Sequence, residues 1–174
     1  MTNLTSNLSK GPQDILDVCR DIRLICAELH HYYADLFVND RAALLFWKRT
    51  AMGEENHAKE FTLIAKLRRQ NVIHSFRSDL LDAEIALIYL QSLLERIKQN
   101  PPSLAEALSS SIKLEEKLSR FHIQNIVKFS DSSFRKQFSK VIRADQERIA
   151  SLRKAYEELL APQPDSSFQC DLTI

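Results

Sequence analysis

Apolar residues recur along most of the chain at alternating steps of four and three positions, and this spacing restricts the fold to packed α-helices. The first stripe of this kind contains Ile15, Cys19, Ile22, Cys26, Leu29, Tyr33 and Leu36. Only two of the 174 residues are glycine, so few positions favour an interruption of a helix. The sequence therefore predicts an all-α protein.

Turn signals divide the chain into two helical hairpins separated by a long connector. The first turn is expected at Asn39-Asp40, which also supplies an N-cap for a second helix that runs to about Arg69. The connector, from Gln70 to Pro102, has its own apolar pattern and predicts a crossover helix. Ser103 is the predicted N-cap of the next helix, and Ser130-Asp131 marks the turn of the second hairpin.

The same patterns predict one domain and restrict its surroundings. We expect a disordered arm over residues 1–11, a helical bundle over 12–161 and a disordered tail over 162–174. No apolar run approaches the ~18 residues of a membrane span, and the amino terminus lacks a signal-peptide layout, so we expect a cytoplasmic protein without membrane attachment. The formal net charge of +1 does not indicate a nucleic-acid partner.

The most informative motif pairs Glu54 with His57, three residues apart and therefore on one helical face. That face also carries an apolar stripe, formed by Leu44, Trp47, Ala51, Ala58, Phe61 and Ala65. Glu54 thus occupies a position where a core residue is expected, and a buried carboxylate needs a partner. The motif is a metal-site signature, so that partner is either a metal ion or another group of the protein.

The two hairpins align as repeats of each other in spacing and apolar phase. The segment 23–37 corresponds to 115–129, so Arg23 aligns with Glu115. The second helices align residue by residue as well: Trp47, Glu54, His57 and Phe61 with Phe138, Asp145, Arg148 and Leu152. The counterpart of Glu54-x-x-His57 is therefore Asp145-x-x-Arg148.

The chain resembles the ferritin-like superfamily and, within it, the rubrerythrin-like branch. The resemblance covers roughly residues 14–160 and rests on the two-hairpin layout with its long crossover, together with Trp47, Ala51, Glu54, Glu55, His57 and Ala58. It implies an antiparallel four-helix bundle with a crossover helix between the second and third helices. Such proteins hold two iron or manganese ions with one Glu on each of two helices and a Glu-x-x-His on each of the others.

The chain departs from that metal-binding pattern at two positions. Arg23 stands where the first helix should supply Glu, and Arg148 stands where the second His belongs. We therefore expect a degenerate site in which Arg23 and Arg148 pair with three carboxylates, those of Glu54, Glu115 and Asp145, and no metal cofactor is bound. A protonated His57 would bring the formal charge of this set to zero. The implied role is binding or structural rather than oxygen or peroxide chemistry.

The alternative keeps a metal site. Glu54, His57, Glu115 and Asp145 would bind iron, manganese or zinc, and the protein would be a ferroxidase or peroxidase with unidentified catalytic residues. Two further histidines, His30 and His122, occupy matching places in the repeats, and we expect hydrogen-bonded core residues there. Cys19 and Cys26 are expected to be packing thiols. A homodimer through exposed helix faces is a third reading, and it leaves the physiological partner open.

Overall fold

The computed structural model describes residues 15–70, 80–126 and 132–161, and its regular elements are all helices. These are α1 (Ile15–Leu36), α2 (Arg41–Arg69), α3 (Leu80–Gln99), α4 (Leu104–Ile126) and α5 (Ser132–Leu160). No strand occurs within the described residues. The all-α prediction is therefore confirmed, and so are the end of α2 at Arg69 and a separate helix in the connector.

Both predicted N-caps are present. The Asp40 carboxylate accepts hydrogen bonds from the backbone N–H groups of Ala42 and Ala43, at 2.9 and 3.0 Å. At α4, the Ser103 hydroxyl accepts from Glu106 N, and the Glu106 carboxylate accepts from Ser103 N at 2.9 Å. This reciprocal pair is a capping box, and it fixes where α4 begins after the prolines.

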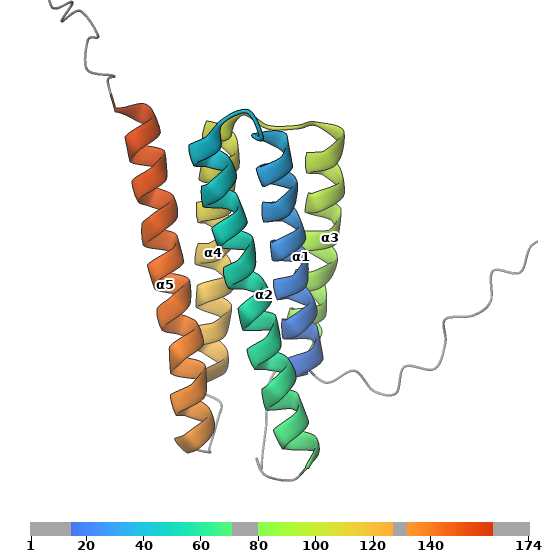
Figure 1. The fold of residues 1–174 in the computed structure, drawn as a ribbon. Coiled ribbons are helices and arrows are strands. Elements are labelled where there is room, and N and C mark those ends of the chain that lie inside the picture. Colours follow the sequence, from blue (N-terminus) through green and yellow to red (C-terminus); the bar gives the residue numbers. More distant parts are fainter. Residues whose placement is uncertain (1–14, 71–79, 127–131, 162–174) are drawn as a thin grey trace, which may run out of the picture.

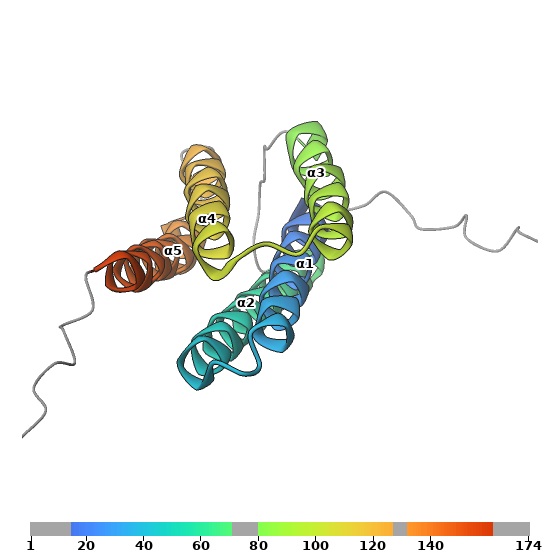
Figure 2. The ribbon, with the colours of Figure 1, turned by 90° about the horizontal axis from the view of Figure 1, so that it is seen from above.

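The long helices form two hairpins, and the connector helix lies on the outer side of one of them (Figure 1). α1 packs along α2, and α4 packs along α5. Viewed from above, α3 lies beside α1 and away from α5 (Figure 2). Side chains from α1, α2, α4 and α5 meet between the hairpins, where the buried charged residues lie.

The core is apolar except at its centre. Its largest fully buried side chains are Trp47, Arg23, Tyr33, Phe61, Leu16, Ile22, Leu152, His30, Glu54 and Glu115. Aromatic rings gather around the indole of Trp47, whose ring centroid lies 4.8 Å from that of Tyr33 and 5.2 Å from that of Phe46. Cys19 and Cys26 are buried free thiols, as expected.

α3 buries less of its apolar surface than its sequence suggested. Ala83, Leu90 and Leu94 are buried. The opposite face of the helix is exposed and includes Leu81, Ile85, Ile88 and Tyr89. Because α3 packs mainly on α1, only a narrow stripe of its surface is covered.

Two sequence predictions lie at or beyond the edges of the described structure. The predicted arm, residues 1–11, and the predicted tail, residues 162–174, both fall outside the described residues. Among the described helices, none combines the length and apolar content needed to cross a lipid bilayer.

Candidate functional site

The candidate site is a cluster of charged side chains at the centre of the core. α1 supplies Arg23, α2 supplies Glu54, α4 supplies Glu115 and α5 supplies Asp145, and each of these residues has 0% relative exposure. Arg148, one turn after Asp145 on α5, has a side chain that is 9% exposed. The structure thus brings together all five residues that the repeat alignment and the family resemblance assigned to an arginine and carboxylate network.

Arg23 contacts carboxylates from three other helices. Its Nη1 donates to Glu54 Oε2 at 2.9 Å and lies 3.5 Å from Glu115 Oε2, while its Nη2 donates to Asp145 Oδ1 at 2.7 Å. The neighbouring carboxylates raise the pKa of Arg23 against the opposing effect of burial, so the guanidinium stays charged. Arg23 therefore links α1 to α2, α4 and α5 through one planar group.

Arg148 approaches the same three carboxylates from the opposite hairpin. Its Nη1 lies 2.7 Å from Glu54 Oε1, 2.9 Å from Glu115 Oε2 and 3.3 Å from Asp145 Oδ1. The contact with Glu54 Oε1 is an ion pair by distance but lies outside hydrogen-bonding direction. Because Glu115 Oε2 is shared by Arg23 and Arg148, the two guanidiniums and the carboxylates form one connected network.

His57 is a neutral member of this network. Arg148 Nη2 lies 3.0 Å from His57 Nδ1, and a guanidinium carries only donors, so Nδ1 must accept and the ring proton must lie on Nε2. Burial and the two nearby arginines lower the pKa of His57 to about 3. The condition under which the formal charges of this set would sum to zero, a protonated His57, is therefore not met.

With His57 neutral, the charges of the network do not cancel unless a carboxylate takes up a proton. Three carboxylates face two guanidiniums, which leaves a formal charge of −1 in a fully buried place. Burial, with the adjacent Glu115 carboxylate as a further cause, raises the pKa of Glu54 to about 8. The pKa of Glu115 is lowered because Arg148 and Arg23 outweigh its burial. At neutral pH the proton therefore belongs on Glu54.

Cys26 is a member of the centre that helical phase did not single out. Its Sγ and one carboxylate oxygen each from Glu54 and Glu115 all lie within 4.8 Å of one another. Burial raises the pKa of the Cys26 thiol well above its usual value, so the sulfur carries its proton. The available signal was position, because Cys26 follows Arg23 by three residues on the same face of α1.

The four ligands of the alternative reading all lie around Arg148, and two of them, Glu54 and Glu115, belong to a group close enough to hold one ion. Among the described residues, the only set of three or more candidate ligands is Cys26, Glu54 and Glu115. His57 Nδ1 lies 3.9 Å from Asp145 Oδ1, but its lone pair accepts from Arg148. Arg23 and Arg148 donate to Glu54 Oε2, Glu115 Oε2 and Asp145 Oδ1, whereas Glu54 Oε1 and Glu115 Oε1 have no hydrogen-bond partner among the described residues.

His30 occupies an aromatic environment rather than a polar one. Its ring stacks on Trp47 with centroids 5.4 Å apart and an interplanar angle of 21°. Neither ring nitrogen has a hydrogen-bond partner among the described residues, and burial lowers the pKa of His30 to about 4. The expected hydrogen bond is thus not found within the described part, and the side chain of His122 lies outside that part.

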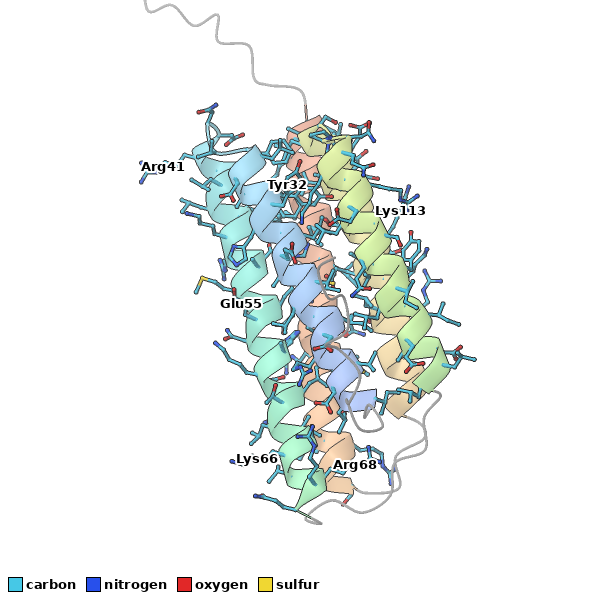
Figure 3. The ribbon with its side chains drawn as sticks, turned by 90° about the vertical axis from the view of Figure 1, so that its right-hand side faces the viewer. Tyr32, Arg41, Glu55, Lys66, Arg68 and Lys113 are labelled. Carbon is cyan, nitrogen blue, oxygen red and sulfur yellow. The ribbon has the colours of Figure 1, made fainter. Side chains whose placement is uncertain are left out.

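Adjacent glutamates on α2 have opposite environments. Glu55 lies on the outer side of the helix, where its carboxylate is 2.9 Å from His31 Nε2 of α1 (Figure 3). That pair is exposed, whereas Glu54 is fully buried. The sequence Glu54-Glu55 therefore marks the boundary between the core face of α2 and its solvent face.

The chain was also compared with known proteins. No family model, no curated protein and no solved structure matches it. The functional argument therefore rests on the geometry of the buried centre.

Proposed function

We propose that this protein is a ferritin-like, rubrerythrin-related four-helix bundle in which arginine side chains replace the metal ions of a di-metal centre. Its role is then binding or structural rather than redox catalysis. The observation that carries the proposal is Arg23, whose guanidinium lies 2.9, 3.5 and 2.7 Å from carboxylates of three different helices. In a metal-binding relative, a cation bridging carboxylates from several helices would be the metal itself.

The electrostatic balance supports the absence of metal. Each guanidinium supplies a fixed positive charge to the carboxylates, and Glu54 becomes neutral by protonation. A divalent ion added beside Arg23 and Arg148 would meet two permanent positive charges at close range. It would also have to displace the arginine donors from Glu115 Oε2 and Asp145 Oδ1.

Oxygen or peroxide chemistry needs a bound metal with an open coordination position, and the cations that contact the carboxylates of this centre are guanidiniums. Glu54, Glu115 and Asp145 have 0% exposure, and their nearest polar neighbours are arginines. The Coulomb energy of such a network is largely offset by the cost of desolvating its charges. Its main contribution is therefore to the specificity of helix packing rather than to net stability. We therefore assign the centre a structural role in aligning the hairpins.

One observation favours the alternative, a metal-binding ferritin-like oxidoreductase of the ferroxidase or peroxidase type. Cys26, Glu54 and Glu115 place a sulfur and two carboxylate oxygens within 4.8 Å of one another. Sulfur and oxygen donors suit zinc or iron. Binding would require Cys26 to lose its proton and the arginines to move, and the raised pKa of the thiol opposes the first step.

Metal content and metal-dependent stability distinguish the two functions. The protein is purified without chelator and its iron, manganese and zinc content is measured, followed by thermal unfolding with each ion added. An ion that binds only the folded state at 100 times its Kd stabilises by about 2.7 kcal/mol, whereas a metal-free network predicts no stabilisation. Stoichiometric metal that is lost in Glu54→Ala would overturn the proposal.

A further inference from the structure

An open groove lies between α2 and α5 and shares one residue, Arg148, with the buried centre. Its volume is about 410 Å³, within the range of small-ligand sites. It is lined by Phe46, Arg49, Thr50, Gly53, Arg148, Ser151, Lys154, Ala155 and Glu158. The first half of α2 and the second half of α5 that form it lie at the same end of the molecule (Figure 1).

The charges along the groove favour an anion. Arg49, Arg148 and Lys154 are cationic, against one acid, Glu158, which lies 3.7 Å from Lys154 as an exposed pair. Arg49 is an exposed residue of the groove. Within the described residues it has no ion-pair partner. The charge of Arg148 is already matched by the buried carboxylates, and that of Lys154 is paired with Glu158, so Arg49 is the lining cation left for an anion.

Arg148 offers a hydrogen-bond donor at the floor of this groove. Its Nη1 is engaged by the buried carboxylates, while its Nη2 is 3.0 Å from His57 Nδ1. Nη2 carries two N–H groups and His57 uses one, so the second has no acceptor among the described residues. A buried guanidinium N–H that faces an open groove is a polar anchor for a ligand oxygen.

Gly53 keeps the approach to this donor open. A glycine inside a helix costs stability relative to alanine, and neither its backbone nor its packing requires one here. A Cβ at this position would meet only Arg148 Nη2, at 3.9 Å, which is ordinary contact. The consequence of a side chain at residue 53 would be to cover Nη2 from the groove.

We propose that the groove binds a small amphipathic organic anion, with a carboxylate or phosphate group held by Arg49 and Arg148. The apolar part of the ligand packs on Phe46 and Ala155, which supply the hydrophobic lining. This inference goes beyond the proposed function, because it assigns a ligand class to a surface site rather than a role to the buried centre.

The test is calorimetric titration of the full chain with octanoate and, in parallel, octyl phosphate, with 1-octanol as the uncharged probe. The wild type should bind at least one anion with a Kd below about 1 mM and should bind 1-octanol much more weakly. The tighter of the two anions then identifies the preferred acidic group. Binding of neither anion, or equal binding of 1-octanol, would overturn the proposal.

Two substitutions locate the site. Arg49→Gln should weaken anion binding about tenfold, the effect of one lost charge-assisted hydrogen bond. Lys48→Gln is the matched control, since it removes the same charge from the adjacent exposed residue of α2, which does not line the groove. Gly53→Ala should weaken binding while raising the thermal midpoint. Unchanged affinity in both Arg49→Gln and Gly53→Ala would place binding elsewhere and contradict the assignment.

Discussion

Arg23 Nη2 lies 2.7 Å from Asp145 Oδ1, and this buried ion pair joins α1 to α5, the first and the last of the described helices. The same guanidinium also reaches Glu54 and Glu115. A residue that contacts three carboxylates of three helices holds both hairpins in one relative position. Arg23 is the fully buried cation of the centre, and its removal leaves these carboxylates with Arg148 alone.

Arg23→Met should destabilise the protein by about 3–5 kcal/mol, because it leaves buried carboxylates without their cation. Chemical denaturation monitored by circular dichroism measures the change. Arg20→Met is the matched control: Arg20 pairs with Asp17 and Asp21 near the surface of the same helix, and its loss should cost less than about 1 kcal/mol. Equal effects of the two substitutions would show that the buried pairs carry no special weight.

Stability should fall as the pH decreases below about 6.5. Burial lowers the pKa of His57 to about 3 and that of His30 to about 4 from a usual value of 6.5. Below pH 6.5 both histidines of the unfolded chain take up protons that the native state does not hold, which outweighs the one proton that native Glu54 keeps, so acid favours unfolding. Urea denaturation across pH 4.5–6.5 should show this decrease, and a flat profile would contradict neutral buried histidines.

Stability should also fall as the pH rises from about 6.5 to 8, because of Glu54. Its pKa is raised by burial from 4.5 to about 8, so the native state holds a proton that the unfolded chain has released. The decrease should approach about 1 kcal/mol per pH unit. Glu54→Gln mimics the protonated acid and should remove this slope. The same slope in wild type and variant would place the proton elsewhere.

The repeat relationship predicts that metal binding can be restored. The double substitution Arg23→Glu and Arg148→His places carboxylate and imidazole ligands at the two positions where the chain differs from the metal-binding pattern. We expect this variant to bind iron or manganese and to gain thermal stability from it, as metal analysis and calorimetry would show. A folded double variant that binds no metal would count against the alignment of Arg23 with Glu115.

Capping gives a local check on the first hairpin. Asp40→Ala removes the acceptor for Ala42 N and Ala43 N and should cost about 1 kcal/mol. Asn39→Ala, at the preceding turn residue, should cost much less. The difference between the two unfolding free energies measures the cap, and no difference would mean that the cap contributes little.

Helical phase predicted much of the fold and the composition of the centre. The steps of four and three in α1 and the repeat of the hairpins are properties of sequence spacing, and they placed Arg23, Glu54, Glu115 and Asp145 on inward faces. Caps at Asp40 and Ser103 depend on local residue chemistry, so they too were predictable. Phase gives direction from the helix axis, which indicates which side chains of these helices face the core.

Distances and protonation were not predictable in the same way. The hydrogen bond from Arg148 Nη2 to His57 Nδ1 requires a neutral imidazole ring. That hydrogen bond depends on how α2 and α5 are positioned relative to each other. Cys26 lies beside Glu54 and Glu115 because side chains from α1, α2 and α4 enter the same centre, with their ligand atoms within 4.8 Å of one another. The apolar residues of α3 could not reveal which phase packs, since both phases of that helix contain large apolar side chains.

The most direct test of the proposal that arginines replace the metal ions is a crystal structure grown with Mn²⁺, with anomalous scattering used to locate the ion. The account predicts no anomalous peak among the carboxylates, and Arg23 and Arg148 within ion-pair distance of Glu54, Glu115 and Asp145. A peak about 2.0–2.2 Å from oxygens of Glu54 and Glu115, with both guanidiniums displaced, would contradict it.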